Sequence, residues 1–204
     1  MARKSILNFF AVLLVLLPAS TAFAQNDPEQ LVVDVSRDAL EILREYRPTY
    51  DDNPELLQNE LLALLDPVID FEAFSRGVMG NYRDQATDSQ REQFRELFKA
   101  TLVDLYTSAL VATEIRDIQV RETNMRSDTS ASVLVDVTAA DGTSYEVSYS
   151  MRRDDAGTWK ARNIIIDGVN VGLTYRNQFR SVMETENGDM ERVIQIWPEV
   201  IDGA

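Results

Sequence analysis

The fold of this chain is constrained most by a block of alternating apolar and polar residues over positions 115–166. Every second residue is apolar over 131–137, and the same period of two returns over 145–151. Asp141-Gly142, a dipeptide typical of tight hairpin turns, separates these two segments. A second turn leads to a further apolar segment over 159–166. Short turns between segments of this period predict an antiparallel meander of four to five strands with one apolar face.

A period of three to four residues replaces the period of two on both sides of this block. Thr87 and Gln90 form a T-x-x-Q capping box, which predicts the start of the longest helix. We expect helices to pack on the single apolar face of the sheet, which makes the chain an α+β protein. A curled sheet covered in this cone-like way can leave a hydrophobic cavity between its layers. The expected helices cover residues 28–46, 54–65, 88–110 and 171–184, and a last short helix ends at Trp197-Pro198.

The composition excludes much of the usual enzyme chemistry. The 204 residues include no Cys and no His, which rules out disulfides, thiolate nucleophiles, Ser-His-Asp triads and imidazole metal sites. The eight glycines form no phosphate-binding G-x-G-x-x-G array, and we expect neither a metal nor a cofactor. With 34 acidic and 20 basic residues, the net charge is −14, which argues against nucleic acid as a partner.

Residues 1–24 have the form of a cleaved secretory signal peptide. A basic start at Arg3-Lys4 precedes an apolar stretch over 6–17, and Ala22-Phe23-Ala24 fits the cleavage site. The apolar stretch is too short to cross a bilayer, although an uncleaved anchor remains the alternative. Cleavage would leave a single mature domain over 25–204. Its net charge would change from −14 to −16, because the removed peptide carries two basic residues and no acidic ones.

Paired carboxylates are the main catalytic device that this composition leaves. The candidates for glycosidase-like acid–base work are Asp51-Asp52, Asp66 with Asp70, and Asp154-Asp155. Each pair also fits a structural role at a helix end or in a hairpin turn. A carboxylate-dependent enzyme therefore stays open as an alternative, and it would need two acidic side chains that converge in a cavity.

The apolar and aromatic side chains of the predicted sheet allow two interpretations. In an antiparallel pairing, Val133, Val135 and Val137 face the strand that carries Tyr149 and Val147. A filled hydrophobic core and the lining of a cavity give the same periodicity along a strand. The pattern alone therefore leaves both open.

Three segments carry a resemblance to a known family. DGVNVGLTYRNQFRSVM at 167–183 matches a motif in which an acidic residue, Gly and Val end a strand and Tyr-Arg-x-Gln-Phe follows. Segment 68–106 has a matching Gln-Arg-x-x-Phe-x-x-x-Phe helix, and segment 147–169 has a Gly-x-Trp-Lys strand start. Taken together, they resemble the MlaC / toluene-tolerance (Ttg2) family of periplasmic phospholipid-binding proteins over nearly the whole mature chain. Arg162-Asn163 departs from this pattern, since the family often has an aromatic residue followed by Asp there.

This resemblance implies a function in transport without a chemical reaction. The protein would be a monomeric periplasmic carrier of phospholipid between the outer and inner membranes, which maintains the lipid asymmetry of the outer membrane. Its partners would be an inner-membrane ABC transporter with an MCE-domain protein and an outer-membrane lipoprotein–porin complex. The fold would be NTF2-like, with acyl chains between sheet and helices and the headgroup near solvent. Another hydrophobic cargo, such as a hopanoid or an aromatic solvent, is the alternative.

The resemblance also suggests residues for the binding site. Arg176 is the headgroup candidate, and the Gly168 and Gly172 junctions could act as hinges when the helices move over the sheet. The candidate lipid-binding residues are Tyr82, Phe98, Leu102, Leu105, Val133, Val135, Val147, Tyr149, Val169, Val171, Tyr175 and Phe179.

Overall fold

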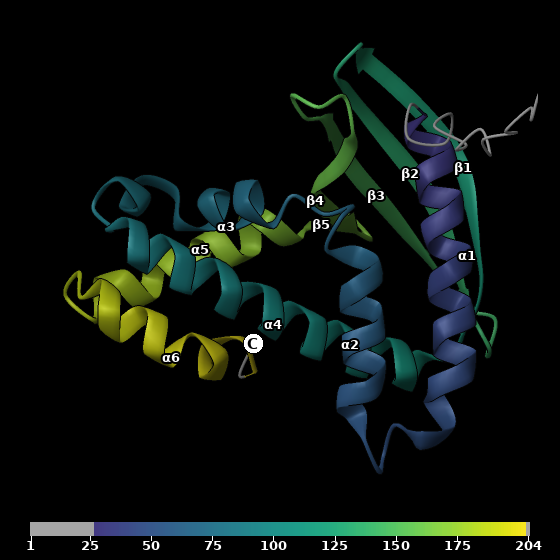
Figure 1. Cartoon of the computed structure of the whole chain (residues 1–204), viewed down its shortest axis with the longest axis horizontal. Helices are drawn as coiled ribbons and strands as arrows, with labels where there is room; N and C mark the ends of the chain where they lie inside the picture. The colour runs from purple at the N-terminus through teal and green to yellow at the C-terminus, as the bar shows by residue number, and fades with distance from the viewer. Residues whose placement is uncertain (1–26, 203–204) are drawn as a thin grey trace, which may run out of the picture.

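The computed structural model describes residues 27–202, so the expected signal peptide lies outside the described residues. Figure 1 shows a mixed fold in which one antiparallel sheet stands beside a layer of helices. Within the described range, no helix is long and apolar enough to cross a membrane. The helical elements are α1 (Pro28–Tyr46), η2 (Arg47–Thr49), α2 (Pro54–Leu65), α3 (Phe71–Met79), η3 (Gly80–Asp84), α4 (Asp88–Thr113), α5 (Val171–Thr185) and α6 (Met190–Asp202).

The sheet is the meander that the alternating block predicts. Its strands are β1 (Ile115–Ser127), β2 (Ser130–Ala139), β3 (Ser144–Arg153), β4 (Trp159–Ile166) and the short β5 (Val169–Asn170). They pair antiparallel in chain order, and the sheet is not closed into a barrel. Val133 lies opposite Tyr149 and Val135 opposite Val147, as expected from the sequence. The α+β class and the number of strands are therefore confirmed.

Local signals in the sequence set the start of several helices. Both hydrogen bonds of the Thr87–Gln90 capping box are present. The backbone N–H of Gln90 donates to Thr87 Oγ1 at 3.2 Å, and the backbone N–H of Thr87 donates to Gln90 Oε1 at 3.0 Å. Asp70 accepts a hydrogen bond from the Ala73 N–H at the start of α3. Such caps satisfy backbone donors that the first turn of a helix leaves free.

The helices cover the sheet in two separate places (Figure 1). α1 packs along β1 and β2, whereas α3 and α5 contact β4. α4 contacts α2, α3 and α6, so that it connects the two regions. On the opposite, polar face of the sheet, Arg121 forms ion pairs with Asp136 and Glu146.

The end of the chain differs from the sequence-based expectation. The last helix does not stop at Trp197-Pro198 but continues as α6 to Asp202, with Pro198 inside it. Ile194, Trp197 and Ile201 are all buried, and their spacing places them on one face of the helix. Burial of this face stabilises the helix beyond the proline, which removes only one backbone donor.

The buried apolar residues form three clusters. The helical core lies among α3, α4, α5 and α6, and its centre is Phe94, whose ring is 4.9 Å from Phe179 and 5.3 Å from Trp197 between centroids. The sheet core consists of the apolar face of β2–β4 and Val32 of α1. A third cluster joins α1 to α2 around Leu57. The sheet and the helical layer thus have separate cores.

Candidate functional site

The boundary between the sheet core and the helical core is the candidate site. Ile69, Ile164 and Ile166 are only partly buried, and each packs against both cores. Tyr149 of β3 packs against the sheet core only, and Leu105 of α4 packs against the helical core only. We call these five residues, together with Tyr106, the seam. Their partial exposure shows that side chains are packed less completely at the boundary between the two cores than inside either core.

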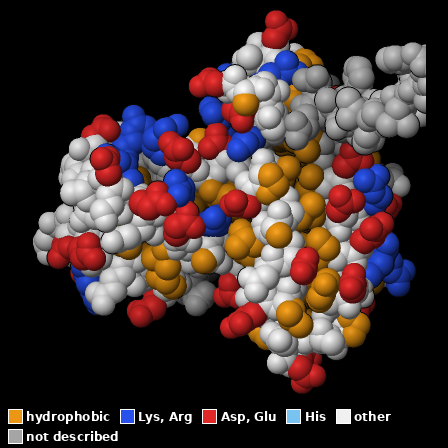
Figure 2. Space-filling view, in the orientation of Figure 1, with side chains coloured by type: hydrophobic (Ala, Val, Ile, Leu, Met, Phe, Trp, Pro, Cys, Tyr) orange, Lys and Arg blue, Asp and Glu red, His pale blue; other side chains and the backbone are white. Residues whose placement is uncertain are grey.

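Exposed apolar surface also lies between α1 and α2. Figure 2 shows hydrophobic side chains gathered in a band between α1 and α2 in the orientation of Figure 1. On these helices Val33 and Leu56 are 39% and 46% exposed. A contiguous apolar band on a monomer is typical of a site that takes a hydrophobic ligand or partner.

One polar pair lies at the seam. The phenol groups of Tyr106 of α4 and Tyr175 of α5 lie close enough to each other to influence each other's pKa. Burial raises the pKa of both phenols, and the neighbouring Tyr106 raises the pKa of Tyr175 further. Burial also raises the pKa of Tyr149 on the opposite wall. These phenols therefore stay neutral at physiological pH and add hydroxyl groups, not charges, to an apolar region.

Side-chain amides tie the start of α5 to β4. Asn163 Oδ1 accepts the Gly172 N–H at 3.0 Å, and Asn163 Nδ2 donates to Asn170 Oδ1 at 3.0 Å. Asn170 in turn accepts the Leu173 N–H at 2.9 Å, which caps the helix. A Cβ atom on Gly172 would lie 2.6 Å from Asn163 Oδ1, so only glycine allows this close approach. We call the contacts among Asn163, Asn170 and Gly172 the joint between α5 and β4. These few polar contacts hold the start of α5 next to Ile164 and Ile166.

The residues expected from the sequence divide between the two walls of the seam. Val169 belongs to neither wall, because it is 57% exposed in β5. In the helical wall, Phe98, Leu102, Val171, Tyr175 and Phe179 are buried, and Tyr82 and Leu105 pack against them; in the sheet wall, Val133, Val135 and Val147 are buried, and Tyr149 packs against them.

Sequence reasoning missed four residues of the seam: Ile69, Tyr106, Ile164 and Ile166. The two β4 residues lie in the run Ile164-Ile165-Ile166, where the lack of polar alternation hides which side chains face the helices. Tyr106 adjoins Leu105 in α4, but only the packing of α4 against α5 shows that it meets Tyr175.

The paired carboxylates have structural partners. Asp70 caps α3 and accepts a hydrogen bond from Arg162 Nε at 2.8 Å. Asp66 forms an ion pair with Lys99 at 3.0 Å, and Asp154 accepts the N–H groups of Ala156 and Thr158 in the hairpin turn. Asp51-Asp52 is exposed in the turn before α2. Across residues 27–202, no three acidic side chains gather in a way that could hold a metal ion.

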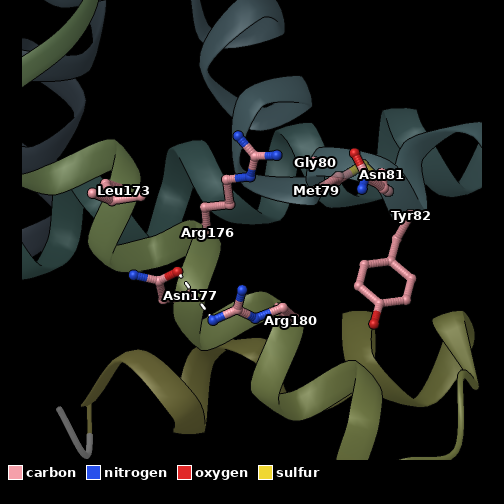
Figure 3. A pocket seen from close by; sticks show the side chains of 8 residues that line it. All are labelled: Met79, Gly80, Asn81, Tyr82, Leu173, Arg176, Asn177 and Arg180. Atoms are coloured by element: carbon pink, nitrogen blue, oxygen red, sulfur yellow. Dashed lines mark hydrogen bonds between the residues drawn. The ribbon is translucent and has the colours of Figure 1, made fainter.

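Arg176 lies in a pocket on the outer side of α5. The pocket has a volume of about 230 Å³ and lies between α5 and η3 (Figure 3). Arg176 points from α5 towards Gly80, Arg180 points along α5 towards Asn177, and Gly80 and Tyr82 line the opposite side. Arg176 is exposed and packs against Gly80, which has a φ of +55°. The headgroup candidate is therefore on the exposed side of α5, whereas Tyr175 is buried in the helical core.

Comparisons with known proteins agree with this fold. The family model of the MlaC protein matches residues 33–199. Toluene tolerance protein ttg2D of Pseudomonas putida is 32% identical over 187 residues, which cover 91% of this chain and 86% of that protein. A solved structure of the phospholipid-binding protein from Ralstonia solanacearum, in complex with a phospholipid, has a TM-score of 0.73 at 23% identity and covers 85% of this chain and 96% of that one. The chain therefore belongs to the MlaC family.

Proposed function

We propose that this protein is a periplasmic phospholipid carrier that holds the acyl chains of its cargo in the seam. The observation that carries the proposal is the separation of the two cores by partly buried apolar residues. Membership of the MlaC family and the phospholipid in the solved relative from Ralstonia solanacearum support the choice of cargo. The headgroup would stay near solvent, and no cofactor or reaction is required.

The energy of tail burial fits a carrier. Each methylene removed from water contributes about 0.8 kcal/mol, so two long acyl chains contribute on the order of 20 kcal/mol before the costs of binding are subtracted. Spontaneous release into water would then be very slow. Transfer needs contact with a partner that opens the seam or offers another apolar site.

The seam must widen to admit a lipid chain. Ile69, Ile164 and Ile166 pack against both cores, and α5 is joined to β4 through Asn163 and Gly172. Movement of α5 and α4 away from the sheet would expose Ile164, Ile166 and Tyr149 to an incoming chain. The two separate cores favour such a movement, because each layer keeps its own buried centre while the boundary opens.

We further propose the partners that a carrier of this kind needs. An inner-membrane ABC transporter with an MCE-domain protein would stand at one end of the route, and an outer-membrane lipoprotein–porin complex at the other. Lipid exchange between these two membranes would maintain the asymmetry of the outer membrane. The similarity to a toluene tolerance protein supports a role at the cell envelope.

The first test changes one face of β4 and leaves the other intact. Ile166 faces the seam, whereas Ile165 lies on the opposite face and pairs with Ser148. In Ile166→Glu, a buried carboxylate would meet the acyl chains, so we expect lipid loading to fall about tenfold or more. Ile165→Glu, the matched control, should load like the wild type. Phosphorus analysis of purified protein measures the load, and circular dichroism confirms folding. Full loading of a folded Ile166→Glu protein would contradict the placement of the chains.

A further inference from the structure

The pocket beside α5 is unusual for so acidic a chain. Two arginines line it, and no carboxylate does, although the sequence has 34 acidic and 20 basic residues. The other polar groups of its lining include the side-chain amides of Asn81 and Asn177. All four side chains can donate hydrogen bonds, so the pocket offers donors and positive charge to whatever enters it.

The two guanidinium groups are not neutralised by neighbours. Arg176 has no ion-pair partner within residues 27–202, and Arg180 donates only a long hydrogen bond of 3.4 Å to Asn177 Oδ1. By contrast, Arg76 and Arg83 on the adjoining α3 and η3 each pair with a carboxylate, Glu72 and Asp84 respectively. The local arrangement therefore leaves the positive charge of the pocket available for a ligand.

The position of Arg176 depends on the backbone that it contacts. A Cβ atom on Gly80 would lie 2.9 Å from Arg176 Nε and 3.4 Å from its Nη2. Glycine also suits the positive φ of this residue, which follows α3 directly. The guanidinium group is thus held against η3 on one side of the pocket, while Arg180 approaches from the next turn of α5 (Figure 3).

We propose that this pocket binds a phosphate group, as a monoester or a diester. Planar guanidinium groups donate paired hydrogen bonds to phosphate oxygens, and the two asparagine amides can complete the shell. The volume of about 230 Å³ accommodates a phosphate with a small alcohol such as glycerol. The phosphate comes either from the headgroup of the lipid cargo, which rests on the proposed function, or from a free phosphate ester, which does not.

The test uses sn-glycerol 3-phosphate and inorganic phosphate as probes of the lipid-free mature protein. Isothermal titration should show binding to the wild type and about tenfold weaker binding to the double variant Arg176→Gln/Arg180→Gln. The matched control Arg44→Gln/Arg126→Gln removes two exposed arginines outside the pocket and should bind like the wild type. Equal affinity in all three proteins, or no binding to the wild type at millimolar phosphate, would overturn the proposal.

A second measurement distinguishes the two sources of phosphate. Protein loaded with phosphatidylglycerol should no longer bind glycerol phosphate if the headgroup occupies the pocket, and the ³¹P resonance of the cargo should then shift in Arg176→Gln/Arg180→Gln. If the loaded protein binds glycerol phosphate as the empty protein does, the pocket serves a free phosphate ester. A protein that carries no phospholipid would refute the proposed function. The titration of the lipid-free form would still show whether the pocket binds phosphate.

Discussion

At the scale of residues, the contact between the phenol groups of Tyr106 and Tyr175 is a feature with a testable consequence. It connects α4 with α5 at the edge of the helical core, next to the partly open seam. Burial disfavours the ionised form of each phenol and raises its pKa, so ionisation of either group costs folding free energy. The pair therefore makes the stability of the helical layer sensitive to alkaline pH.

We predict that Tyr175→Phe lowers the free energy of unfolding at neutral pH. The variant should also lose less of this stability than the wild type when the pH is raised above about 10. Loss of the polar interaction of the Tyr175 hydroxyl should cost about 1 kcal/mol of stability at pH 7. In the unfolded chain a tyrosine ionises near pH 10, whereas in the fold the pKa of Tyr175 is raised. The folded state then holds more protons than the unfolded state, so wild-type stability falls as pH rises above about 10.

Urea unfolding at a series of pH values from 7 to 11 measures this effect. Phenylalanine has no proton to lose, and Tyr175→Phe should show a shallower slope than the wild type above pH 10. Tyr106→Phe should behave in the same way, because the pKa of Tyr106 is also raised by burial. Identical slopes in the wild type and both variants would show that the pair has no such role.

Some residues of the site could be predicted from the sequence, and others could not. Val133 and Val135 are buried as their alternation indicates, since the apolar face of a strand follows from its period. Val169 continues the same apolar pattern but lies exposed, because β5 is only two residues long and pairs solely with β4. The asparagines Asn163 and Asn170 carry no sequence signal for the joint that they form.

At the scale of elements, the joint between α5 and β4 controls how the helical layer meets the sheet. The side chains of Asn163 and Asn170 take part in three hydrogen bonds, and the backbone of Gly172 lies close to Asn163. These contacts are short-range and polar, unlike the apolar packing inside each layer. They can break and re-form without unpacking either core.

We predict that Asn163→Ala loosens this joint and speeds the release of bound lipid. The Gly172 N–H loses its acceptor, and Asn170 Oδ1 keeps only the Leu173 N–H, which should cost about 1–3 kcal/mol of stability. If lipid release needs α5 to part from β4, the release rate should rise about tenfold. Transfer of a fluorescent phospholipid to acceptor vesicles measures the rate. Asn124→Ala, on the exposed β1, is the control, and an unchanged release rate in a folded Asn163→Ala protein would exclude α5 as the moving element.

Most of the elements follow from local chemistry. The capping box at Thr87 and Gln90 and the turn at Asp141-Gly142 act within a few residues, so the start of α4 and the β2–β3 hairpin are predictable. The extension of α6 beyond Pro198 is not, because it depends on the burial of Trp197 and Ile201 against residues that are far away in the sequence. Tertiary burial outweighs the local effect of the proline.

At the scale of the whole molecule, the two cores and the seam between them define the architecture. The sequence predicts an α+β fold with apolar faces, but it cannot distinguish a filled core from two cores with an open boundary. Both arrangements need the same apolar residues at the same spacing. The difference arises from where α1 and α5 rest on the sheet, which leaves Tyr149, Ile164 and Ile166 only partly covered.

The net charge of the chain acts at the same scale. At −14, and −16 without the expected signal peptide, the net charge would repel the protein from anionic membrane surfaces and attract it to basic faces on the proposed partners. The pocket with Arg176 and Arg180 is locally positive, in contrast to the negative net charge of the chain. A carrier of this kind would collect a single lipid without adhering to the bilayer from which the lipid comes.

The most direct test of the account is the analysis of what the protein holds when it is purified from the periplasm. Mass spectrometry of an organic extract, calibrated against protein concentration, identifies and counts the bound molecules. We predict diacyl phospholipid in a stoichiometric amount. An extract without lipid, or one that contains a hopanoid or another hydrophobic compound in place of phospholipid, would contradict the proposed function.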